Sequence, residues 1–150
     1  MVRKRVVVCV LAVGLAGCST DKSQPNAGSP DSGIRMPQVL VGGQPRAVSG
    51  GVTCHRAGDY VTIGIGDVSN GVGAVVTTSN PPLVRTVGLG TIDGVALGFT
   101  NSEPGQADSA AAAMRGKSYT IKGTASGSDL RNPQSPQQVS KSFEMDVTCP

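Results

Sequence analysis

The fold is decided most clearly by one stretch, Asp59-Tyr60-Val61-Thr62-Ile63-Gly64-Ile65-Gly66. Apolar side chains alternate there with polar or small residues, which places Val61, Ile63 and Ile65 on a single face. Successive side chains of a β-strand point to opposite faces, whereas an α-helix repeats about every 3.6 residues. The stretch therefore predicts a strand with one face turned toward a hydrophobic core.

The same alternation recurs along residues 38–150. Further strands are predicted at 38–42, 48–54, 73–78, 84–90, 95–100, 117–125 and 141–149. Turns are indicated at residues 43–45, at the Asn-Gly of 67–71 and at Asp93-Gly94, because such pairs favour positive φ. Asn80-Pro81-Pro82 should end a strand, since proline has no amide hydrogen to donate.

Two segments give weaker patterns. Residues 101–116 predict a loop with one helical turn at Ala110 to Ala113, because alanine has the highest helix propensity. Residues 126–140 contain two prolines and predict a long loop. Several short strands with glycine-rich turns predict an all-β protein, with residues 38–150 forming a single antiparallel β domain, either a sandwich or a curled sheet.

The N-terminal segment has the order of an export signal. Arg3-Lys4-Arg5 precede an apolar run of eleven residues from Val6 to Ala16, and Leu15-Ala16-Gly17-Cys18 follows the pattern of a lipobox. A membrane-spanning helix needs about 20 apolar residues, so the run indicates a signal h-region. Residues 1–17 are predicted to be a lipoprotein signal peptide, with Cys18 as the lipidated residue. A buried core helix and ordinary signal cleavage beside a coincidental cysteine are the alternatives.

The composition after the signal separates a tether from the domain. Residues 18–37 are rich in serine and proline and poor in apolar side chains, which predicts a disordered lipidated tether. The chain has 13 Lys and Arg against 10 Asp and Glu, and three of the cations belong to the signal. The mature protein is therefore expected to be neutral, which argues against nucleic-acid binding.

Four cysteines have different expected fates. Cys9 leaves with the signal and Cys18 carries lipid, so Cys54 and Cys149 remain as an even pair in an oxidising compartment. We interpret these two as a disulfide. The alternative, a metal site, needs more ligands than the neighbouring His55 provides.

Catalytic signatures are weak in this sequence. His55 is the single histidine, and we expect it to be an exposed bystander. In the final predicted strand, Phe143, Met145, Val147 and Cys149 should point inward and Glu144, Asp146 and Thr148 outward. Two carboxylates at this spacing suit acid–base work or a weak cation, but more often form a solvated face. Gly88-Leu89-Gly90 lacks the third glycine of a nucleotide-binding loop.

Collinear stretches across the β region carry a family resemblance. They are Val52-Thr53-Cys54, Val61 to Gly66, Asn80-Pro81-Pro82, Val87 to Gly90, Gly94 to Thr100, Tyr119 to Gly127, Asn132 to Pro136, Lys141 to Glu144 and Val147-Thr148-Cys149. With the lipobox, they resemble the mycobacterial 19-kDa lipoprotein antigen family. Two features depart from that family: the tether holds one threonine, Thr20, which puts family-type glycosylation in doubt, and His55-Arg56 replaces smaller polar residues.

The resemblance implies a non-enzymatic lipoprotein of the mycobacterial cell envelope, held on the extracytoplasmic face of the cell membrane by acyl groups on Cys18. It also implies the bridge between Cys54 and Cys149, sensing of the acyl groups by host Toll-like receptor 2, and no cofactor. The alternative function is an envelope carrier or binding protein for a lipid or other apolar ligand. A hydrolase would require His55 to lie against a serine or aspartate in a cleft.

Overall fold

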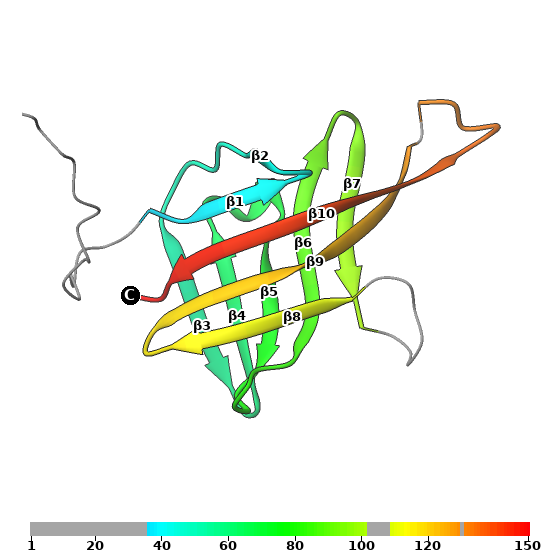
Figure 1. Ribbon diagram of the computed structural model, residues 1–150. Coiled ribbons are helices and arrows are strands. Elements are labelled where there is room, and N and C mark those ends of the chain that lie inside the picture. Colours follow the sequence, from blue (N-terminus) through cyan, green and yellow to red (C-terminus); the bar gives the residue numbers. More distant parts are fainter. Residues whose placement is uncertain (1–35, 102–108, 130) are drawn as a thin grey trace, which may run out of the picture. The chain divides into compact units, whose positions relative to one another are not determined.

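The computed structural model describes residues 36–101, 109–129 and 131–150 (Figure 1). Residues 1–17, Cys18 and most of the expected tether lie outside this part of the chain. The described residues form ten strands and one short 3-10 helix. These are β1 (Gln38–Val41), β2 (Gln44–Pro45), β3 (Val52–Ala57), β4 (Tyr60–Ile65), η1 (Val68–Asn70), β5 (Val72–Thr77), β6 (Val84–Ile92), β7 (Val95–Thr100), β8 (Ala110–Arg115), β9 (Ser118–Asp129) and β10 (Gln137–Thr148).

All ten strands belong to one antiparallel sheet in the order β2-β1-β10-β9-β7-β6-β5-β4-β3. Strand β8 also pairs with β9, along Ser118 to Gly123, whereas β7 pairs with β9 further on, at Ser126 and Asp129. The long strand β9 therefore belongs to two parts of the sheet. Figure 1 shows β1, β10, β9 and β8 crossing in front of β3 to β7. The expectation of an all-β, curled antiparallel sheet is confirmed.

The core lies between the two parts of the curled sheet. Val61, Ile63 and Ile65 of β4 are buried, as their alternation predicts. The described core residues form a single hydrophobic cluster, to which every strand except β2, β3 and β8 contributes buried side chains. Its largest fully buried side chains are Ile63, Ile65, Leu89, Ile121, Met145 and Val76. The same alternation in β10 buries Phe143, Met145 and Val147.

The prediction of a loop with a helical turn at Ala110 to Ala113 is wrong. These alanines form most of β8, which pairs with β9 in a tight hairpin so that Ala112 lies opposite Ile121. The two strands are joined at Gly116, whose φ of +60° suits a turn. Hydrogen bonding to the edge of β9 satisfies the backbone and overrides the helix propensity of a short alanine run.

Three further boundaries differ from the sequence prediction. Residues 126–129 and 137–140 belong to the paired strands β9 and β10 rather than to a long loop. Their serines, glutamines and glycine carry little apolar alternation, so the ladder hydrogen bonds have no counterpart in the sequence pattern. The second strand begins at Val52 rather than residue 48, and Gln44–Pro45 pairs briefly with β1 where a turn alone is predicted.

Candidate functional site

A disulfide links the edge strand β3 to the end of β10, which lies third from the opposite edge in the strand order. Cys54 lies in β3, at the end of the strand order, and Cys149 directly follows β10. Their Cα atoms are 5.7 Å apart, within the usual range for a disulfide. No backbone ladder among the described strands joins β3 to β10. The disulfide therefore links two strands covalently that are separated by five others in the strand order.

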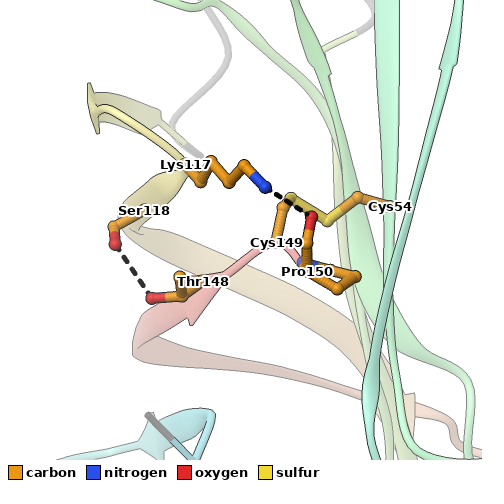
Figure 2. Close-up of a disulfide and its surroundings, with 6 residues drawn as sticks. All are labelled: Cys54, Lys117, Ser118, Thr148, Cys149 and Pro150. Carbon is orange, nitrogen blue, oxygen red and sulfur yellow. Dashed lines mark hydrogen bonds between the residues drawn. A yellow bond between two sulfur atoms is a disulfide. The ribbon is translucent and has the colours of Figure 1, made fainter. Parts of the chain in front are cut away.

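Hydrogen bonds lie beside the disulfide (Figure 2), and both of its cysteines pack against the hydrophobic core. The Cys149 amide donates to the Lys117 carbonyl at 2.9 Å, and Lys117 Nζ donates to the Pro150 carbonyl at 3.1 Å. The hydroxyls of Ser118 and Thr148 lie 2.8 Å apart, one donating to the other. These contacts hold the start of β9 against the end of β10 and present no activated nucleophile.

The neighbouring His55 is exposed, as expected, and lies opposite Thr62 in the β3–β4 ladder. Across the described ranges, no group of three or more His, Cys, Asp and Glu side chains is arranged to hold a metal ion. In the part of the chain that the structure describes, no hydrogen bond or ion pair joins this imidazole to a serine or an aspartate.

The paired carboxylates of β10 bond to their cross-strand neighbours on β9. Glu144 lies opposite Lys122, and their charged groups are 2.8 Å apart. The Thr120 hydroxyl donates to Asp146 at 2.6 Å. The hydrogen bond and charge of Glu144 raise the pKa of the exposed Lys122 ammonium. This pattern fits the interpretation of a solvated outer face, with each carboxylate held by one partner.

A second charged pair closes β9. The backbone amide of Arg131 donates to Asp129 at 2.9 Å, and Nε of the same arginine donates to the carboxylate at 2.9 Å. These hydrogen bonds lower the pKa of Asp129 to about 2. The backbone amide and the side chain of Arg131 thus donate to the same carboxylate.

Four glycines lie in register across the sheet, and we call them the glycine row: Gly64, Gly73, Gly88 and Gly98 on β4 to β7. A Cβ at Gly73 would lie 2.3 Å from the Ile63 carbonyl oxygen, so backbone occupies the space a side chain needs. The row alternates with buried residues and faces away from the core. Three of its members, Gly64, Gly73 and Gly88, line an open cavity of about 280 Å³. Thr53, Thr62 and Thr86 line it as well.

A second open cavity, of about 380 Å³, lies beside η1 and the register shift between Gly88 and Thr91 in the β6–β7 pairing. Arg46, from the segment after β2, lines it. No motif in the sequence singles out this arginine. Its only signal is a lone cation in a stretch without other charges, residues 38–54. Its proximity to β6 depends on the topology.

The lipidation site predicted at Cys18 lies outside the described residues. Within residues 36–101, 109–129 and 131–150, no helix has the length and apolar character needed to cross a bilayer.

Residues 32–149 match the family described as Mycobacterium 19 kDa lipoprotein antigen. The chain belongs to this family. It is 42% identical to the lipoprotein LpqH of Mycobacterium tuberculosis over 155 residues, covering 93% of this chain and 91% of the relative. It is 48% identical to LpqH of Mycobacterium avium over 112 residues, covering 75% and 67%. A lipoprotein of Mycobacteroides abscessus, named as putative, is 33% identical over 146 residues, covering 93% and 92%.

Membership confirms the family resemblance drawn from the collinear motifs. The family is one of mycobacterial lipoprotein antigens, and these relatives are named as lipoproteins. Lipoproteins are associated with membranes through their acyl groups.

Proposed function

We propose that this protein is a lipid-anchored surface lipoprotein of the cell envelope, acylated at Cys18 and non-enzymatic. The observation that carries the proposal is 42% identity to LpqH across 93% of the chain. In this proposal residues 1–17 are the signal peptide, residues 18–37 the lipidated tether and residues 38–150 the displayed β domain. The lipobox Leu15-Ala16-Gly17-Cys18 supports the same assignment from the sequence.

The anchor works without a spanning helix. Each buried methylene of an acyl chain contributes about 0.8 kcal/mol of membrane binding, so a diacylglycerol group with a further acyl chain holds firmly. A tether of this composition behaves as a coil and reaches roughly 25 Å root-mean-square. It lifts the β domain off the bilayer on the extracytoplasmic side, where the signal delivers it.

The β domain serves as a display module rather than a catalyst. His55 is exposed, and Glu144 and Asp146 are each bonded to a neighbour on β9. What a host innate receptor such as Toll-like receptor 2 senses is the acyl group on Cys18. In this scheme the folded domain determines how the acylated terminus is presented.

The alternative of a carrier for a lipid or other apolar ligand requires an enclosed apolar cavity. The buried side chains instead form one continuous cluster, and the two cavities described above are open at the surface. This observation favours display over transport of an acyl chain inside the domain. Lipid extraction of native protein followed by mass spectrometry tests the alternative directly.

The anchor is tested by Cys18→Ala in the full chain, with Cys9→Ala as the matched control. We expect Cys18→Ala to leave the membrane fraction or to accumulate unprocessed, and Cys9→Ala to behave as the parent. Intact-mass spectrometry should report acyl groups on the parent and the control alone. Retention of Cys18→Ala in the membrane fraction at the parental level and mass would overturn the assignment.

Receptor sensing is tested with the same pair of variants. Acylated protein and the Cys9→Ala control should activate cells that carry Toll-like receptor 2, whereas protein lacking acyl groups should not. Equal potency of acylated and non-acylated protein would place the signal in the polypeptide instead of the lipid.

A further inference from the structure

Arg46 extends across the backbone of β6. Its amide donates to the Val39 carbonyl at 2.7 Å, which fixes the residue to β1. At the other end of the side chain, Nη2 lies 2.9 Å from the position that a Cβ on Gly90 would take. Gly90 has a φ of +67°, a conformation that suits glycine, and its lack of a side chain leaves room for the guanidinium. The backbone of Arg46 is therefore fixed to β1, and its guanidinium lies in the space that a side chain at position 90 would occupy.

One nitrogen of the guanidinium, Nη1, is buried and lacks a hydrogen-bond partner. Among the side-chain nitrogens and oxygens buried in the described part of the chain, Arg46 Nη1 is the one without a hydrogen bond. The ion pairs formed by these residues involve Lys122, Arg131 and Lys141, and none includes Arg46. Buried donors are nearly always paired, because an unpaired one loses its hydrogen bonds to water without replacement. An acceptor placed within hydrogen-bond distance of Nη1 would satisfy this donor.

The cavity beside Arg46 has the size and chemistry to supply that acceptor from outside. Its volume of about 380 Å³ lies in the range of small-molecule sites. Ser69, Asn70 and Thr91 line it with groups able to donate hydrogen bonds, and its lining contains no Asp or Glu. A lining that has donors and a cation but no carboxylate favours an anion.

We propose that this cavity binds an oxyanion, a phosphate or carboxylate group, with Arg46 as the principal donor. The planar guanidinium presents several N–H groups in a fixed fork that matches the two oxygens of such an anion. The same group is carried by free phosphate and by the headgroups of anionic lipids. The inference concerns the β domain alone and goes beyond the proposed anchoring at Cys18, so either can fail without the other.

The test uses the full acylated chain in an uncharged detergent, with binding measured by calorimetry and by NMR shifts of the Gly71, Gly90 and Thr91 amides. Probes are inorganic phosphate, acetate and dioctanoyl-phosphatidylglycerol. Chloride at matched ionic strength and uncharged dioctanoylglycerol are the controls. We expect the three probes, and neither control, to shift these three amides. Tighter binding of the phospholipid than of phosphate would identify a lipid headgroup as the source, and equal binding a soluble anion.

Variants separate the site from general charge effects. Arg46→Gln should weaken binding at least about tenfold, as expected for loss of a charged hydrogen-bonding partner. Arg46→Lys keeps the positive charge but loses the planar fork of N–H donors, so its affinity should lie between those of the parent and Arg46→Gln. Arg56→Gln removes an exposed arginine from β3 and should bind as the parent. Equal weakening by Arg46→Gln and Arg56→Gln, or binding of dioctanoylglycerol as tight as that of the phospholipid, would overturn the proposal.

Stability gives a second readout. If Arg46 serves to bind a ligand, its guanidinium, whose Nη1 is unpaired, contributes little to the stability of the ligand-free protein. In the absence of an anion, Arg46→Gln should therefore leave the melting temperature unchanged or raise it. Addition of phosphate should then stabilise the parent and not the variant, because a ligand that binds the folded state alone raises its stability. A variant that melts well below the parent without anion, with phosphate raising both equally, would assign Arg46 a purely structural role.

Discussion

Removal of the Cys54–Cys149 bond should destabilise the β domain by an amount that follows from the loop it closes. The two residues are 95 apart in sequence. Loop-closure entropy for such a loop corresponds to about 4.7 kcal/mol at 25 °C. A domain of this length has an unfolding entropy of about 0.24 kcal/mol/K, so the expected fall in melting temperature is about 20 °C. The loss of about 4.7 kcal/mol is a large part of the roughly 5–15 kcal/mol by which most folded domains are stable.

The structure also predicts where the loosening begins. Strand β3 pairs with β4 alone, and its other edge has no ladder partner among the described strands. Without the disulfide, β3 is held by the β4 ladder and by side-chain packing. Amide hydrogens of Val52 to Ala57 should therefore exchange faster after reduction, and those of the central strand β6 much less.

The assay is calorimetric melting of the parent, Cys54→Ser, Cys149→Ser and the double variant, each with and without reductant. The three variants should melt at similar temperatures, since each removes the same bond, and reductant should affect the parent alone. The reasoning would be refuted by a parent whose melting temperature is unchanged by reductant. A double variant that loses roughly twice as much as either single one would show that the thiols act separately.

Three further predictions concern other parts of the fold. Gly73→Ala should cost about 1–3 kcal/mol, because its Cβ would lie 2.3 Å from a carbonyl oxygen, whereas Gly51→Ala meets no atom within 4 Å and should be nearly neutral in denaturant titration. Met145→Ala should cost about 2–5 kcal/mol by emptying a fully buried position, and Met114→Ala at an exposed one within about 0.5 kcal/mol. The folded-state pKa of Asp129, about 2, lies below its ordinary 3.8, so its contribution to stability is complete above the ordinary pKa and is lost as pH falls toward 2. The difference in melting temperature between the parent and Asp129→Asn should therefore shrink between pH 5 and pH 2.

Each of these predictions has an outcome that contradicts it. Equal stability of Gly73→Ala and Gly51→Ala would mean that the β4–β5 pairing relaxes freely around an added methyl group. Equal costs at Met145 and Met114 would contradict the assignment of the core face of β10. A difference between the parent and Asp129→Asn that stays constant down to pH 2 would show that Asp129 has no lowered pKa.

Most strands of the sheet were predictable because their faces differ in polarity. Val61, Ile63 and Ile65 alternate with polar or small residues, and such alternation has one structural solution when a single face is buried. Strand β8 was not predictable in this way. Its alanines have too little side chain to reveal a buried face, and only the edge of β9 determines their conformation. Local propensity was misleading where the long-range partner supplied the hydrogen bonds.

The candidate sites also differ in whether the sequence alone identifies them. Cys54 and Cys149 were identifiable because cysteines in an exported protein pair, and counting left only these two. Arg46 was not identifiable, since its role depends on a glycine 44 positions away whose missing side chain makes room for the guanidinium. Residue counting finds covalent partners, whereas a cavity arises from strand order and from a bulge that the sequence does not mark.

The disulfide has a consequence for digestion of the protein. Any single peptide bond cut between residues 54 and 149 leaves both fragments in one covalent molecule, because the bridge spans that whole interval. A protease that nicks a turn in this region therefore releases no peptide until the bridge is reduced or a second cut is made. For an antigen, the supply of peptides from most of the domain then depends on the reducing power of the compartment that degrades it.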